Sequence, residues 1–164
     1  MSALTKILDA YYRLLKLLLT LLMGGLIVPI LMQVLSRHVG IIPRFIWTEE
    51  IARFCFVWVI MLGAMVAVRD GTHFDVDLLP DRIPRWLNAA ITLFAHLAVF
   101  CVAITFIYYG YDFAVLGSRQ QSEISGLPML TIYIAWPIAG VTWVLFLFER
   151  IAADIRRFRT EQPA

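Results

Sequence analysis

Charge is scarce in this chain of 164 residues: only 16% of them are Asp, Glu, Lys or Arg, whereas 61% are hydrophobic. Soluble domains contain about 25% charged residues, so this composition excludes a soluble globular domain. The formal net charge is only +2. We attribute this small excess to membrane topology and to contacts with lipid headgroups, and we expect no nucleic-acid partner.

Cysteine and histidine are also rare, with two and three copies. Cys55 and Cys101 lie in apolar segments, where thiols behave as small hydrophobes, so we expect no structural disulfide. His96 is the only titratable side chain expected near the middle of the membrane. A neutral histidine is favoured there over a proton relay, which would need acidic or histidine partners. A haem would need a second axial ligand at the same depth, so we expect no cofactor and no enzyme activity.

The sequence contains four long uncharged runs. They cover Leu17–Ser36, Phe54–Val68, Trp86–Tyr111 and Ile124–Phe148, with 20, 15, 26 and 25 residues. A spanning helix needs about 20 apolar residues, and the second run has only 15. The helix that contains this run must therefore begin earlier in the sequence, near Trp47. We predict an all-α membrane protein with one domain, residues 1–164, and four transmembrane helices at about 14–36, 47–69, 86–110 and 127–149. Alternating apolar and basic residues within 1–16 predict a short N-terminal amphipathic helix.

Basic residues are distributed unequally between the two sides of this predicted bundle. The side with both termini and the loop between the second and third spans collects ten: Lys6, Arg13, Lys16, Arg69, Arg82, Arg85, Arg150, Arg156, Arg157 and Arg159. The other side has four: Arg37, Arg44, Arg53 and Arg119. The positive-inside rule therefore predicts that both termini are cytoplasmic.

The second predicted span begins with charged residues, Glu49, Glu50 and Arg53, between Trp47 and Trp58. Arg53 follows Glu49 by four positions and Glu50 by three, so both carboxylates can reach it on one helix face. The cluster could be a substrate site, an internal ion-pair staple or a contact for another subunit. Its position at the membrane edge favours a staple or subunit contact. The tryptophans are expected to anchor the membrane interface or pack against neighbouring helices.

Gly71 is a candidate C-cap of the second predicted helix, and the predicted inner loop Thr72–Arg85 contains His73, Asp75 and Asp77. A His-x-Asp-x-Asp sequence could suggest a metal site. Such a site needs converging ligands and a supporting second shell, and the spacing supplies neither. We therefore favour capping and turn formation over metal binding.

Taken together, these motifs resemble the small membrane subunit (DctQ-like, or Q) of tripartite ATP-independent periplasmic (TRAP) transporters. The resemblance extends over nearly the whole chain. It is carried by Trp-Thr-Glu-Glu-Ile-Ala-Arg-Phe at 47–54 leading to Trp58, Leu-Gly-Ala at 62–64, Arg-Asp-Gly-Thr-His-Phe-Asp-Val-Asp at 69–77, Ser-Gly-Leu-Pro at 125–128, and Tyr133 with Pro-Ile-Ala-Gly at 137–140.

The resemblance implies a subunit of a secondary transporter in the bacterial inner membrane. In that family a large, DctM-like subunit moves the substrate with sodium, and a DctP-like periplasmic protein captures an organic acid such as a C4-dicarboxylate or sialic acid. The small subunit would brace the large one. Its motif residues, by implication subunit contacts or structural, would be Trp47, Glu49, Glu50, Arg53, Trp58, His73 and Asp75.

Two other interpretations remain open at this stage. A four-helix subunit of another tripartite carboxylate transporter would share the hydropathy pattern, but should lack the Glu-Glu-x-x-Arg and Gly-Thr-His-x-Asp-x-Asp elements. A membrane redox subunit would bind haem or quinone, which an absorption spectrum of the purified chain would reveal.

The charge asymmetry makes a topological prediction. A reporter that is active only in the periplasm should be active when fused after Arg119 and silent when fused after Asp81. The reverse pattern of activity would show that the orientation is wrong.

Overall fold

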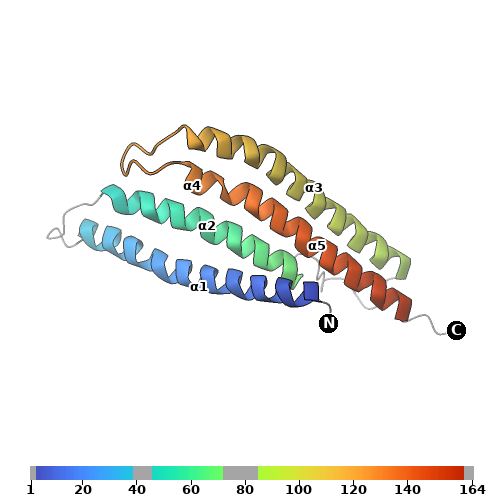
Figure 1. Ribbon diagram of the computed structural model, residues 1–164. Coiled ribbons are helices and arrows are strands. Elements are labelled where there is room, and N and C mark those ends of the chain that lie inside the picture. Colours follow the sequence, from blue (N-terminus) through green and yellow to red (C-terminus); the bar gives the residue numbers. More distant parts are fainter. Residues whose placement is uncertain (1–2, 39–45, 72–84, 161–164) are drawn as a thin grey trace.

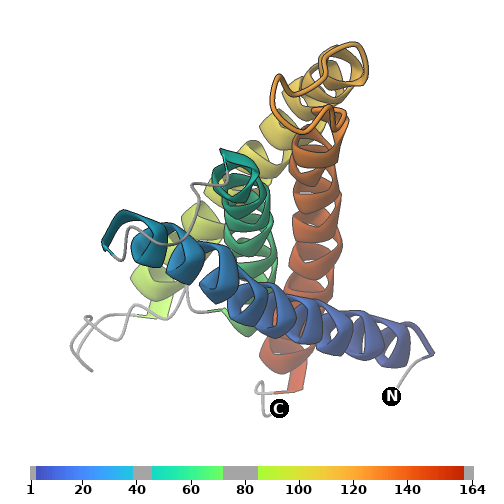
Figure 2. The same cartoon turned by 90° about the vertical axis from the view of Figure 1, so that its left-hand side faces the viewer.

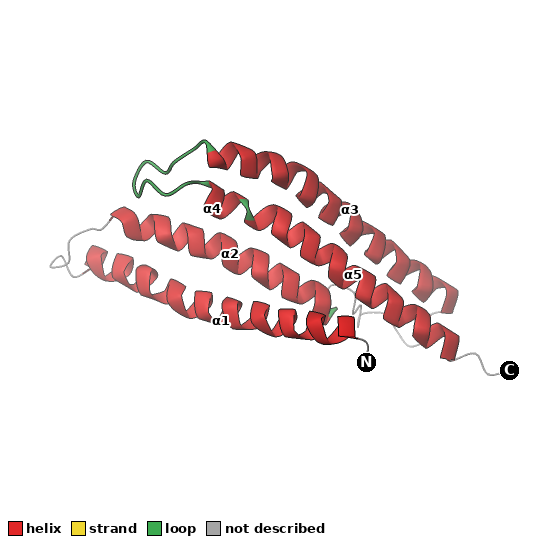
Figure 3. Cartoon of the chain, in the orientation of Figure 1, coloured by secondary structure: helices red, strands yellow, loops and turns green. Residues whose placement is uncertain are grey.

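The structure, a computed structural model, describes residues 3–38, 46–71 and 85–160, and this part of the chain is almost entirely helical (Figures 1 and 3). The helices are α1 (Ala3–His38), α2 (Ile46–Asp70), α3 (Arg85–Ser118), α4 (Leu130–Tyr133) and α5 (Ala135–Thr160). Four segments are long and apolar enough to cross a membrane: Thr5–His38, Trp47–Asp70, Ala90–Ser118 and Leu130–Ala152. The predicted all-α class with four spans is confirmed.

The helices form two antiparallel pairs, α1 with α2 and α3 with α5, which meet where α2 contacts α5. This order makes α2 and α5 central and leaves α1 and α3 outside (Figure 1). In the most apolar stretch of the outer helices only 11% of residues are buried, against 33% in α2 and 39% in α4–α5. Figure 2 shows α1 strongly inclined to the other helices, with its N-terminal half crossing α5.

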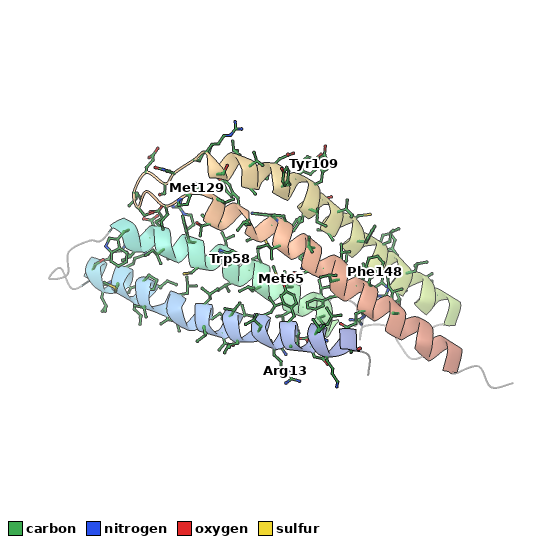
Figure 4. All side chains as sticks on the ribbon, in the orientation of Figure 1. Arg13, Trp58, Met65, Tyr109, Met129 and Phe148 are labelled. Carbon is green, nitrogen blue, oxygen red and sulfur yellow. The ribbon has the colours of Figure 1, made fainter. Side chains whose placement is uncertain are left out.

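The buried core follows the faces of α2 and α5 that meet each other and α1. Met65, Val68 and Phe146 are its largest fully buried side chains. Trp58 and Met65, both labelled in Figure 4, lie on α2 between its neighbours, whereas Arg13 points away from α1. The other core members are Leu8, Leu15, Met61, Leu62, Val66, Ala135 and Ala139.

Small residues bring α3 and α5 into close contact. Ala103, Gly110 and Gly117 recur at intervals of seven along α3, so all three lie on one face of the helix. A Cβ atom on Gly110 would lie 2.8 Å from Pro137 Cδ, and one on Gly140 would lie 2.8 Å from the Ala103 carbonyl oxygen. These backbones therefore approach as closely as helices do in membranes when small residues line the contact.

The helices depart from the predicted boundaries in three places and agree with the prediction at Gly71. The N-terminal segment is helical, and it is continuous with the first span in α1. Gly71 ends α2 with φ of 78°, and its N–H donates to the Ala67 carbonyl oxygen at 3.1 Å, which confirms the predicted C-cap. The third span extends beyond its expected end near residue 110, to Ser118. The chain expected to form one last span is divided at Ile134, because Pro137 lacks the N–H that would bond four residues back.

The glycines allow a matched test of the α3–α5 contact. Gly140→Ala should lower the free energy of unfolding by about 1–3 kcal/mol, because the new methyl group meets backbone atoms of α3. Gly63→Ala is the control, since a Cβ there has nothing within 4 Å and the same gain in helix propensity applies. Thermal unfolding of the purified chain in detergent measures both. Equal stability of the two variants would contradict the contact.

Candidate functional site

The charged residues at the start of α2 point in different directions. Arg53 Nη2 lies 3.6 Å from Glu49 Oε1, and both side chains are about two-thirds exposed, at 67% and 68%. Glu50 is turned inward and is only 6% exposed. Within the described residues its Oε2 atom has no hydrogen-bond partner. The expected sharing of Arg53 by both carboxylates is therefore found only for Glu49.

These side chains line a cleft of about 530 Å³ at one end of the molecule. One wall comes from the first turns of α2, and the other comes from the loop between α3 and α4 and from α4 itself. The lining residues are Glu49, Glu50, Arg53, Phe54, Gln120, Gln121, Ser122, Glu123, Ile124, Met129 and Ile132. Figure 4 shows the labelled Met129 on the loop side, next to the start of α2.

Backbone hydrogen bonds fold the loop wall into a small hairpin. Ser122 N–H donates to the Leu127 carbonyl at 2.9 Å, and Met129 N–H donates to the Gln120 carbonyl at 3.0 Å. Gly126 has φ of 69° and donates to the Ser122 carbonyl at 3.1 Å, which closes the tight turn. The hairpin therefore fixes the position of the polar side chains at the rim of the cleft.

The two tryptophans that frame the motif have different surroundings. Trp47 lies at the start of α2 and is exposed. The Trp58 indole N–H donates to the Thr131 carbonyl oxygen at 2.9 Å, which ties α2 to α4. This bond accounts for a tryptophan there, since the indole can cover an apolar surface and donate one hydrogen bond. His73 and Asp75, the remaining motif residues, lie outside the described residues.

His96 lies buried on α3, beside an apolar cavity of about 220 Å³. The cavity is lined from α3 and α5 by Leu93, Leu97, Phe100, Leu147, Phe148 and Ile151. Among the described residues, no three Asp, Glu, His or Cys side chains converge as metal ligands.

Arg69, at the end of α2 opposite the cleft, has a role that the sequence reasoning missed. Its guanidinium contacts Asp9 Oδ1 at 2.5 Å and Glu149 Oε2 at 3.3 Å, and donates to the Leu8 carbonyl at 3.0 Å. It also lies over the rings of Tyr12 and Phe146, at 4.6 and 5.3 Å from their centroids. One side chain, 14% exposed, thus joins α1, α2 and α5.

A second charged pair lies beside Arg69. Lys16 Nζ is 3.7 Å from Asp70 Oδ2, and the Tyr12 hydroxyl donates to the same carboxylate. The sequence contained a signal for this network. Arg69 and Glu149 each directly follow an uncharged run, so they enter the membrane interface at matching depth.

Comparison with known proteins places these features in one family. The sequence model for the DctQ component of tripartite ATP-independent periplasmic transporters matches residues 26–157. The sialic acid TRAP transporter permease protein SiaT of Haemophilus influenzae is 34% identical over 128 residues, which are 78% of this chain and 20% of that protein. The isethionate TRAP transporter permease protein DctMQ of Oleidesulfovibrio alaskensis is 27% identical over 141 residues, 82% of this chain and 22% of that protein.

A relative of more similar length is the sialic acid TRAP transporter small permease protein SiaQ of Vibrio cholerae. It is 24% identical over 130 residues, which are 79% of this chain and 75% of that protein. The chain thus spans about a fifth of the length of the two longer permeases and about three quarters of this small one.

The two arginines of α2 give a matched pair of substitutions. Arg69→Met should lower the free energy of unfolding by up to about 3 kcal/mol, because it leaves two partly buried carboxylates without their cation. Arg53→Met should lower it by less than about 1 kcal/mol, because its ion pair is exposed. Thermal unfolding in detergent measures the difference. A larger effect at Arg53 would contradict the conclusion that Arg69 holds α1, α2 and α5 together.

Proposed function

The chain belongs to the DctQ family of small TRAP transporter permease proteins, and on that premise we propose that it braces a large membrane subunit. As a member of this family it is a multi-pass protein of the bacterial inner membrane. In the proposed complex, the large subunit carries an organic acid across the membrane together with sodium. A periplasmic binding protein delivers the acid.

The placement of ionisable groups carries this proposal. In the described residues they gather at the two ends of the helices, around Arg69 at one end and around Glu50 at the other. Between these ends, His96 is the only Asp, Glu, Lys, Arg or His in the described part of the chain, and it lies beside an apolar cavity. A transporter that carries its own polar substrate needs compensating groups near the bilayer midplane. We infer that this chain supports transport and does not conduct or catalyse.

The lengths of the relatives support a large partner. SiaT and DctMQ each contain a part that resembles this chain and about four times as much additional sequence. The name DctMQ itself joins an M and a Q component. We propose that the partner of this chain corresponds to that additional sequence.

The names of the relatives also support the proposed substrate class. They mention sialic acid, isethionate and C4-dicarboxylate, all of which are organic anions at neutral pH. We propose an organic acid on this basis.

The proposed roles of the motif residues follow from their positions. If the chain is oriented as its basic residues predict, the cleft with Glu49, Glu50 and Arg53 opens at the periplasmic face. We propose that this cleft, together with Trp47, serves contact with other subunits, whereas Trp58 holds α4 in place. His73 and Asp75 are proposed to belong to the inner connection of the same motif.

Reconstitution into liposomes tests the division of labour. The chain alone should give no sodium-dependent uptake of organic acid, whereas the chain with the large subunit and the binding protein should give uptake. Omission of the chain should abolish uptake and reduce the amount of folded large subunit. Uptake by the chain alone would contradict the scaffold function, and undiminished uptake without it would show that it is dispensable.

A further inference from the structure

We propose that the cleft between α2 and the α3–α4 loop receives an arginine or lysine side chain from the soluble binding protein when that protein docks. This inference rests on the proposed function and adds the chemistry of the contact. It identifies Glu50 as the anion at the bottom of the cleft and Glu49 as an anion nearer its mouth.

The first observation is the charge of the lining. Glu49, Glu50 and Glu123 contribute three negative charges and Arg53 one positive charge, so the cleft has a formal charge of −2. Arg53 is already engaged with Glu49. The negative charge of Glu50 and Glu123 is therefore left to attract a cationic group from outside.

The second, independent observation is the burial of Glu50. Its side chain lines the cleft and is 6% exposed, and no described residue offers its Oε2 atom a hydrogen bond. Burial of a carboxylate without a partner is unfavourable by several kcal/mol. A guanidinium or ammonium group that enters the cleft would remove this penalty, because it would supply both the opposite charge and hydrogen-bond donors.

The shape and the rim of the cleft indicate a protein side chain from the aqueous phase. A volume of about 530 Å³ lies within the range of about 300–1,000 Å³ that is typical of ligand sites, so a whole arginine side chain fits. The rim carries the polar side chains of Gln120, Gln121 and Ser122, held in place by the loop hairpin. Such a rim suits a hydrated contact with a soluble protein better than one with lipid tails.

The test uses the complex of this chain with the large subunit in lipid nanodiscs and in liposomes. Binding of the substrate-loaded binding protein to nanodiscs gives Kd, and uptake at increasing concentrations of that protein gives the half-maximal concentration and the maximal rate. Glu50→Gln should raise Kd and the half-maximal concentration about tenfold, which is about 1.4 kcal/mol, and leave the maximal rate unchanged. High salt should weaken wild-type binding more than binding to the variant.

The control is Asp112→Asn, which removes an exposed carboxylate toward the C-terminal end of α3. Asp112 does not line the cleft. The control substitution should leave Kd unchanged. Glu49→Gln is a second cleft variant at an exposed position, where the fold tolerates the change. It should raise Kd severalfold, so the proposal remains testable if Glu50→Gln does not fold.

The other outcomes overturn the inference. If both cleft variants bind the loaded protein as the wild type does, the cleft takes no cation from it. If a cleft variant instead loses the large subunit during purification, the cation belongs to the membrane partner. Failure of the proposed function is a separate result, since it would show as absence of uptake with the wild-type chain, whereas the nanodisc measurement of Kd still decides the inference.

Discussion

The position of three helices depends on one guanidinium group. Arg69 on α2 holds Asp9 of α1 and Glu149 of α5 and lies over aromatic rings from both helices. In lipid, apolar side chains gain little by leaving the surrounding tails, so helix contacts depend more on polar ties and close packing. The tie gives the α1–α2 and α3–α5 pairs a fixed meeting point, and Tyr11 on α1 adds a hydrogen bond of 2.9 Å to Thr142 of α5.

The opposite end of the molecule is held by different means. Glycines and alanines let the backbones of α3 and α5 touch, and the indole of Trp58 bonds α2 to α4. The cleft lies between the start of α2 and the α3–α4 loop. The same helices are therefore closed by charge at one end and leave a negatively charged cleft at the other.

The sequence allowed the spans to be predicted because uncharged length depends only on composition, and Gly71 could be recognised because a left-handed residue ends a helix at little conformational cost to glycine. It did not allow the orientation of Glu49 and Glu50 to be predicted. Adjacent helical residues point about 100° apart, and α2 is apolar on almost every side, so no pattern marks its buried face. Small residues alone do not mark the contact faces either: Gly24, Gly25 and Gly63 have nothing within 4 Å of a Cβ atom, whereas Ala135 and Ala139 are fully buried.

The two charged ends also differ in how completely their charges are compensated. At the Arg69 end, Asp9 and Glu149 share Arg69, and Asp70 has both Lys16 and the Tyr12 hydroxyl. Among the described residues that line the cleft, Arg53 is the only cation; it pairs with the exposed Glu49 and leaves the buried Glu50 without a hydrogen bond to its Oε2 atom. A buried charge without a partner lowers stability unless a ligand compensates it. The Arg69 network is thus compensated by groups of this chain, whereas in the proposed complex the cleft gains its full stabilisation when the partner supplies a positive charge.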